Sequence, residues 1–220
     1  MTRPALFRSF TYDDAPVNVY WEMTVACDLA CRHCRADALA TRDPLELDTE
    51  EGKALMRDVQ AMGSHLVLTG GDPLKRSDVF DLVAYGRSIH LPIAITPAVT
   101  PLLTRDVIAQ LHDVGVHTIG MSLDGPTADL HDGFRQVPGT FERSMQALDW
   151  CADVGMGVQI NSTVTRETIR TLPAMFDLLR TKRPVKRWSL FNLIPVGRGL
   201  MLGSPTAQQI EDLFAWVHDH

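Results

Sequence analysis

Apolar positions along the chain follow two spacings, short runs typical of buried strands and a helical repeat typical of amphipathic helices. Runs rich in aromatic and β-branched residues predict strands at 19–25, 65–69, 92–96, 116–123, 157–164 and 187–194. Helical spacing predicts helices at 48–62, 77–89, 104–114, 140–154, 172–181 and 204–220. Six strands that alternate with helices in this order predict a parallel sheet with right-handed crossovers.

Polar or glycine-rich segments follow nearly every predicted strand. In chain order they are a cysteine-rich loop after residue 25, Gly70 to Pro73, Thr96-Pro97, Ser122 to Gly125, Asn161 to Thr163 and Pro195 to Gly199. Because parallel strands of a barrel end at the same rim, these segments are expected to form one polar face. A doubly wound sheet would instead concentrate them at one switch point. The distribution favours an α/β fold of the partial (β/α)6, TIM-like barrel type.

The 220 residues are 45% hydrophobic and 22% charged, which suits one large domain with its own core. We expect an N-terminal arm at 1–18 and a core domain at 19–220. The sequence has no apolar run of about eighteen residues and no apolar stretch typical of a signal peptide near its start. A cytoplasmic location without membrane contact is therefore expected. The net charge of −6 argues against a nucleic-acid partner.

Three cysteines, Cys27, Cys31 and Cys34, lie within eight residues directly after the first predicted strand. Thiolates are soft ligands that select zinc, copper(I) or iron–sulfur clusters. A cubane cluster held by three cysteines leaves one iron without a protein ligand, and an open position of this kind is typical of a catalytic centre. The remaining cysteine, Cys151, lies in a predicted helix, where we expect a buried structural thiol.

Two other interpretations of these thiols remain open. A zinc-binding interaction module would need a fourth ligand, such as His33 or a water, and usually a second ligand pair that the sequence lacks. A thiol oxidoreductase would need only the Cys31–Cys34 dithiol, which leaves Cys27 without a role. The cluster interpretation is the one that uses all three cysteines.

The spacing Cys27-x3-Cys31-x2-Cys34 after a first strand resembles the signature of the radical S-adenosylmethionine (radical SAM) enzymes. The resemblance implies a [4Fe–4S] cluster on these cysteines, with S-adenosylmethionine (SAM) bound to the fourth iron. In that family an electron from the cluster cleaves SAM to methionine and a 5′-deoxyadenosyl radical. The position before the third cysteine is often aromatic in the family and is His33 here, where we expect local packing or tuning of the cluster.

The turn Gly70-Gly71-Asp72-Pro73 is similar to the Gly-Gly-Glu-Pro element of the family. Because the backbone of that element meets the amino group of SAM, the resemblance implies that Gly70, Gly71, Asp72 and Pro73 bind the cofactor. Glycines suit such a turn, since a residue without Cβ lets the backbone approach a ligand closely. Aspartate in place of glutamate shortens one side chain and leaves the backbone role intact.

Four further polar residues are candidate contacts to SAM. Ser122 and Asp124 lie two residues apart, hence on one side of a strand end, where they could contact the ribose or the methionine part or cap a loop. Asn161, at the end of the fifth predicted strand, has the same two interpretations. Arg135 has a guanidinium fork that suits the SAM carboxylate, but a surface ion pair with a nearby aspartate such as Asp132 explains it equally well.

Several other stretches resemble the peptide- and haem-modifying branch of the family, which has SPASM-type relatives. They are Ser122 to Gly125, His131 to Arg135 and Gly139 to Phe141. The stretches most similar to its haem-biosynthesis members are Trp21 to Thr24, Cys34 to Ala36 and Pro195 to Gly199. This similarity implies hydrogen abstraction from a tetrapyrrole precursor or, as the alternative, from a peptide, with an electron donor such as flavodoxin or ferredoxin.

Many members of that branch carry a C-terminal domain with additional cysteines that bind auxiliary clusters. Here the sequence ends at His220, and Cys151 is the only cysteine outside the loop. The C-terminal extension is therefore expected to be absent or truncated. The chain would then be either a minimal enzyme or the front part of a longer one.

Overall fold

The computed structural model describes residues 15–35 and 38–220, and six parallel strands form its sheet in the order of the sequence. The strands are β1 (Asn18–Glu22), β2 (His65–Thr69), β3 (Ile93–Ile95), β4 (Thr118–Ser122), β5 (Gly157–Val164) and β6 (Val185–Asn192). The helices are α1 (Thr49–Ala61), α2 (Val79–Ser88), α3 (Arg105–Asp113), α4 (Ala128–Arg135), α5 (Thr140–Val154), α6 (Leu172–Leu179) and α7 (Ala207–Asp219). None of these described helices has the length and apolar character needed to cross a membrane.

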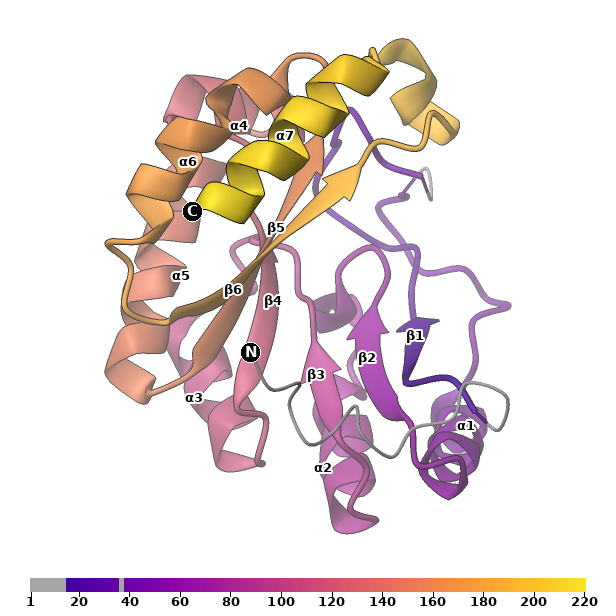
Figure 1. Ribbon diagram of the computed structural model, residues 1–220. Helices are drawn as coiled ribbons and strands as arrows, with labels where there is room; N and C mark the ends of the chain where they lie inside the picture. The colour runs from indigo at the N-terminus through magenta and orange to yellow at the C-terminus, as the bar shows by residue number, and fades with distance from the viewer. Residues whose placement is uncertain (1–14, 36–37) are drawn as a thin grey trace.

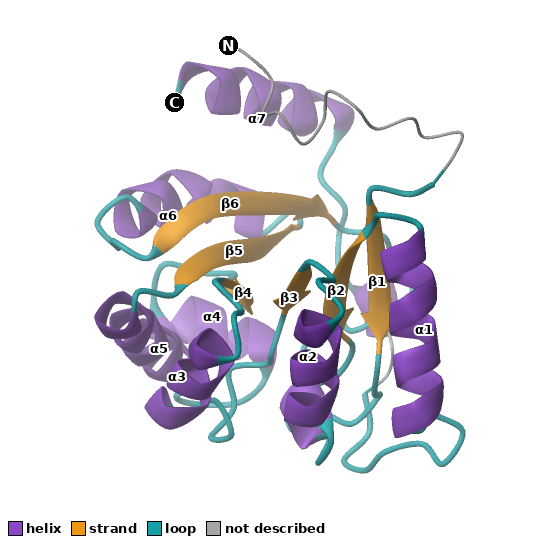
Figure 2. Ribbon diagram, turned by 90° about the horizontal axis from the view of Figure 1, so that it is seen from below, coloured by secondary structure: helices purple, strands orange, loops and turns teal. Residues whose placement is uncertain are grey.

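The sheet bends into an open arc, with β1 and β6 at its two edges and the helices on its outer side (Figures 1 and 2). This arrangement confirms the expected partial barrel of six strand–helix units. Most of the N-terminal arm expected at 1–18 lies outside the described residues. The same is true of Ala36, the last residue of the Cys34 to Ala36 stretch.

Side-chain alternation along the strands separates a buried outer side from a polar inner side. In β2, Leu66 and Leu68 are fully buried in the main apolar cluster, which also contains residues of α1 and α2. Val158 and Ile160 of β5 belong to the same cluster, whereas Gln159 between them is only partly buried. Each such apolar side chain contributes about 1.5–3 kcal/mol when fully buried. The outer side therefore supplies stability and leaves the inner side available for polar residues.

The strand register aligns inner-side polar residues of neighbouring strands. Ser122 of β4 is opposite Asn161 of β5, and Asn161 is opposite Ser189 of β6. At the other edge Glu22 of β1 is opposite Thr69 of β2. Polar side chains thus line the inner side near the carboxyl ends of the strands.

The first strand ends at Glu22 rather than at residue 25, where the sequence predicts its end. Met23 still pairs with strand β2, because its N–H donates to the Thr69 carbonyl at 2.9 Å. Beyond Thr69 the neighbouring chain turns at Gly70, whose φ of +130° breaks the regular ladder. The backbone of the next residues bonds to that turn instead of to a strand.

The sequence pattern missed helix α4, between β4 and α5. Its buried residues are His131, Phe134 and Arg135, so two of the three side chains on its inward face are polar. Leu130, in contrast, is 48% exposed. An apolar repeat is the signal that predicts amphipathic helices, and this helix lacks one because its inward face serves the site rather than the core.

Arg76 joins the end of β1 to the start of helices α1 and α2. Its guanidinium is buried and donates to the carbonyls of Met23 and Leu47 at 3.0 and 2.9 Å. It also bonds both oxygens of Asp78, at 2.8 and 2.6 Å, and lies over the ring of Trp21. A buried arginine with this many acceptors stabilises the fold only as long as the set is complete.

We expect Arg76→Met to lower the free energy of unfolding by about 3–5 kcal/mol, because it leaves the carbonyls of Met23 and Leu47 without this donor and Asp78 without its ionic partner. Urea titration followed by circular dichroism measures the change. Arg180→Met is the matched control, since Arg180 pairs with Asp177 at the surface, where both side chains are more than half exposed. Equal losses in the two variants would contradict this role for Arg76.

Candidate active site

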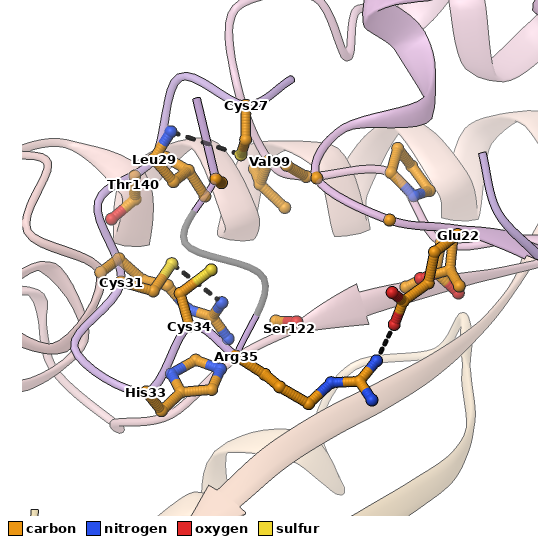
Figure 3. Close-up of a pocket in the computed structure, with 18 of the residues that line it drawn as sticks. Glu22, Cys27, Leu29, Cys31, His33, Cys34, Arg35, Val99, Ser122 and Thr140 are labelled. Carbon is orange, nitrogen blue, oxygen red and sulfur yellow. Dashed lines mark hydrogen bonds and ion pairs between the residues drawn. The ribbon is translucent and has the colours of Figure 1, made fainter. Parts of the chain in front are cut away.

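The carboxyl ends of the strands surround a cavity of about 260 Å³. Its wall includes the three cysteines of the loop, the glycine turn after β2, residues 96–99 after β3 and Ser122 at the end of β4. Figure 3 shows side chains from these separate segments around one space. Parallel barrels gather their functional residues at this face, so the cavity is the candidate active site.

Cys27, Cys31 and Cys34 all line this cavity, and none of the three is in a disulfide (Figure 3). Burial raises the pKa of the Cys27 thiol to about 11. Iron ligation would remove that proton, because a coordinated thiol is deprotonated. Within the described residues, no three His, Cys, Asp or Glu side chains are arranged to hold a single metal ion. A cubane places different demands on the thiols, since each thiolate then binds a separate iron atom.

The glycine turn after β2 holds the segment that leads into Cys27. The N–H groups of Gly71 and Asp72 donate to the carbonyls of Thr24 and Ala26, each at 2.7 Å. A Cβ atom on Gly70 would lie 2.4 Å from the Thr24 oxygen, and one on Gly71 would lie 2.4 Å from the Ala26 oxygen. Both glycines are therefore needed for close packing of two backbone segments, in addition to lining the cavity.

The far end of the cysteine loop is fixed by residues more than a hundred positions away. The Arg198 N–H donates to the Cys34 carbonyl at 3.2 Å, and a Cβ atom on Gly197 would lie 2.8 Å from the same oxygen. The Arg32 N–H donates to the Phe134 carbonyl at 3.0 Å. The 3-10 helix Gly197–Met201, which follows β6, thus meets the loop that follows β1, the opposite edge of the sheet.

A buried ion pair lies beside the cysteines. Asp124 and Arg135 are 3% and 7% exposed, and the Nη2 of Arg135 donates to the Asp124 carboxylate. The other oxygen of Asp124 accepts from the N–H of Thr163 in β5 at 2.7 Å. Burial would raise the pKa of Asp124, but the charge of Arg135 holds it below its usual range. Both groups are therefore charged at neutral pH.

Arg135 also contacts the cysteine loop directly, because its Nη1 donates to the Cys31 sulfur at 3.4 Å. Burial would lower the pKa of Arg135, but Asp124 and Cys31 raise it. Its Nε is buried and has no hydrogen-bond partner among the described residues. Arg135 is thus a buried partner of Asp124 rather than the surface partner of Asp132 that the sequence left open.

Two histidines pack around this pair in their neutral form. Burial lowers the pKa of His131 to about 4, with the nearby Arg135 charge adding to the effect, and its Nδ1 accepts from the Asp124 N–H at 3.1 Å. Burial likewise lowers the pKa of His33 to about 4. The His33 ring stacks on Phe134 with a centroid separation of 4.9 Å. This contact is the local packing expected for the position before Cys34.

The structure brings only some of the sequence-predicted residues to the cavity. Gly70, Gly71, Ser122 and Arg135 line it. The Asp72 carboxylate is buried and instead accepts from the Leu74 and Ala98 N–H groups and the Thr100 hydroxyl. The residues that support the cavity from outside its wall are Asp72, Pro73, Asp124 and Asn161.

Pro73 and Asn161 have local structural roles. Pro73 opens the short 3-10 helix Pro73–Lys75, for which Asp72 is the cap. The Asn161 amide oxygen accepts from Gln159 at 2.9 Å, and its carbonyl accepts from the Leu123 N–H at 3.0 Å. Asn161 therefore holds the strand end from which Asp124 follows.

Four cavity residues lie in stretches whose sequence resembles the radical SAM family, but the sequence did not predict that they line the cavity. They are Glu22, Arg35, His131 and Thr140. Glu22 and Arg35 form an ion pair at the edge of the cavity (Figure 3), and His131 and Thr140 line its wall. Glu22 is the last residue of β1, and its side chain lies on the inner side of the sheet. The alternation of side chains along a strand indicates that side once the position of the strand is known. The histidine and the threonine come from α4 and α5, and no apolar repeat marked the first of these helices.

The fold and the site together define a class of protein, a partial parallel barrel with a cavity lined by three cysteines at its strand ends. The sequence profile described as the Radical SAM superfamily matches residues 21–179. The chain therefore belongs to the radical SAM superfamily, whose members use a [4Fe–4S] cluster and SAM. The soft thiolate donors and the cavity next to them fit such a cluster.

Two curated proteins and one solved structure are similar to this chain. The AdoMet-dependent heme synthase of Oleidesulfovibrio alaskensis is 38% identical over 204 residues, which cover 91% of this chain and 52% of that protein. The mycofactocin maturase MftC of Mycobacterium tuberculosis is 32% identical over 209 residues, which cover 93% and 52%. The crystal structure of Streptococcus suis SuiB bound to S-adenosylmethionine has a TM-score of 0.78 at 16% identity, covers 94% of this chain and 48% of that one, and so supports the fold.

The chain spans about half the length of the curated relatives that it matches. The alignments cover nine-tenths of this chain or more, and the family match at residues 21–179 includes the cysteine loop.

We expect Gly71→Ala to lower the free energy of unfolding by about 1–3 kcal/mol and to displace the segment before Cys27, because its methyl group would overlap the Ala26 carbonyl. Thermal unfolding measures the loss. Gly133→Ala is the matched control, since nothing lies within 4 Å of a Cβ atom there and alanine is the better helix former by about 1 kcal/mol. Equal melting temperatures for the two variants would contradict the proposed close contact.

Proposed function

We propose that this chain is the catalytic barrel of a radical SAM enzyme, which binds one [4Fe–4S] cluster through Cys27, Cys31 and Cys34 and SAM in the adjoining cavity. When bound, the cluster supplies the electron that cleaves SAM to a 5′-deoxyadenosyl radical. The observation that carries this proposal is the convergence of three cysteine side chains and the glycine turn on one cavity at the strand ends. Membership of the superfamily supports it independently.

The chain's own residues would bind and orient the cofactor. Gly70, Gly71 and Ser122 are the proposed contacts to SAM, because they line the cavity beside the cysteines. Arg135 also lines the cavity, and its Nε is the donor that remains for an acceptor such as the SAM carboxylate. Asp72, Pro73, Asp124 and Asn161 would act by positioning these groups, since their side chains or backbones hold the turns that carry them.

The proposed reaction is hydrogen abstraction from a tetrapyrrole of the haem pathway. Similarity to an AdoMet-dependent heme synthase, at 38% identity over most of the chain, favours this substrate class. A peptide is the second candidate, favoured by the similarity to a mycofactocin maturase. Both substrates would reach the cavity from the inner side of the open arc. A small electron carrier, flavodoxin or ferredoxin, is the proposed electron donor.

We expect the protein reconstituted anaerobically with iron and sulfide to bind about four iron atoms per chain and, with dithionite and SAM, to form 5′-deoxyadenosine. Cys27→Ala should lose most of the iron and all of the product, because it removes one of three ligands from a site with none to spare. Cys151→Ala is the matched control, since Cys151 is buried in the apolar core and away from the cavity. Iron quantitation and chromatography of the nucleoside provide the two readouts.

Other outcomes identify the competing interpretations. A colourless protein that holds stoichiometric zinc and ignores SAM would contradict the proposal and favour a zinc-binding module. Dithiol–disulfide activity that survives Cys27→Ala would instead favour a thiol oxidoreductase on Cys31 and Cys34.

A further inference from the structure

Arg135 is a buried cation that faces the sulfur of Cys31, one of the three proposed cluster ligands. It lies at the last position of helix α4 and is 7% exposed, yet it lines the same cavity as the cysteines. A fully charged guanidinium is costly to bury, so its place requires compensating partners. Asp124 compensates its charge, but an exposed pair could do so at lower cost. The position of the pair beside Cys31 suggests that the charge acts on the metal site.

We propose that Arg135 raises the reduction potential of the cluster through an N–H···S hydrogen bond to Cys31, with Asp124 as the residue that positions its guanidinium. The proposal rests on the proposed function, since it requires a cluster on Cys31. It concerns a property of the metal site itself, separate from the binding of SAM.

The geometry fixes the direction of this hydrogen bond. The Nη1 of Arg135 lies 3.4 Å from the Cys31 sulfur, and its Nη2 donates to the Asp124 carboxylate. Asp124 cannot turn away, because its side chain is fully buried and its second oxygen accepts from the Thr163 N–H at 2.7 Å. The planar guanidinium is therefore held between strand β5 and the cysteine loop.

A backbone contact keeps the two ends of this bond together. Phe134 precedes Arg135, and its carbonyl accepts from the Arg32 N–H at 3.0 Å. Arg32 in turn follows Cys31. The end of helix α4 and the cysteine loop are thus joined both through the backbone and through the Arg135 side chain, so that the donor and the sulfur keep their separation.

The physical consequence is a shift of the potential in a known direction. One-electron reduction adds a negative charge that the cluster shares with its thiolate ligands. Hydrogen bonds to the sulfurs and nearby positive charge stabilise that charge, and burial keeps the interaction from being screened by water. The Asp124 carboxylate opposes this effect, but it lies beyond the guanidinium from Cys31 and bonds a different nitrogen. Arg135 therefore raises the potential, and Asp124 limits the rise.

This assignment predicts opposite effects from the two partners of one ion pair. We expect Arg135→Gln to lower the potential and Asp124→Asn to raise it, because asparagine keeps an acceptor that holds the guanidinium but removes the opposing charge. Each shift should be at least tenfold in the equilibrium constant for reduction, about 59 mV for a one-electron couple. Arg135→Lys should recover part of the loss, because it keeps the positive charge without the planar fork. A purely structural role would instead change the two variants in the same direction.

The measurement is a potentiometric titration of the reconstituted full chain without SAM, followed by electron paramagnetic resonance of the reduced cluster. Arg32→Gln is the matched control. It removes a guanidinium next to Cys31, but that group is partly exposed and pairs with Glu167 at 3.2 Å, so we expect no shift. Iron content and circular dichroism of every variant verify that the cluster and the fold are retained.

Each outcome decides the proposal. Opposite shifts with an unchanged control support it, whereas unchanged potentials or shifts of the same sign overturn it. If Arg135→Gln does not retain the cluster, Asp124→Asn carries the test, and an unchanged or lowered potential in that variant overturns the proposal. A wild-type chain that forms no cluster would contradict the proposed function instead, so the two failures are distinguishable.

Discussion

The buried ion pair between Asp124 and Arg135 is the constraint on which the site depends. Two opposite charges are taken out of water here, and the cost is recovered only because each also has other partners, a backbone N–H for the aspartate and a thiol for the arginine. Through these partners the pair connects strands β4 and β5, helix α4 and the cysteine loop. Replacing it with apolar side chains of similar size would keep a core but would remove the side-chain contact between Arg135 and Cys31.

The cysteine loop is held from both edges of an open sheet. On one side the turn after β2 donates two backbone hydrogen bonds to the segment before Cys27, and on the other the 3-10 helix after β6 bonds the Cys34 carbonyl. These contacts fix the backbone on both sides of the three thiols. The position of the loop is therefore set by backbone contacts with the barrel, although the sheet that carries it does not close.

Strand and helix order could be predicted from the sequence, because an outer side buried under helices produces a strong apolar repeat. Strand β5 and helix α5 have the predicted bounds. Helix α4 could not be predicted in this way, since its inward face consists of His131 and Arg135 beside one phenylalanine. The elements that serve the site are those that the apolar pattern describes least well.

The residue types of the candidate site could be predicted from the sequence, but the positions of several side chains could not. Cysteine spacing and the glycine turn predicted a cofactor region, and the structure places both segments at one cavity. The roles of Asp72 and Asp124 required the structure, because each carboxylate turns away from the cavity to bond backbone N–H groups. A sequence shows which residue types are near a site, but only packing determines whether a carboxylate faces a ligand or supports the backbone around it.

The most direct test of this account is Mössbauer spectroscopy of the chain reconstituted with iron-57, recorded before and after the addition of SAM. Three protein thiolates leave one iron of a cubane open, so the account predicts that about one quarter of the iron absorption changes when SAM binds, with the rest unchanged. Iron absorption that does not respond to SAM, or a protein that holds no cubane cluster, would contradict it.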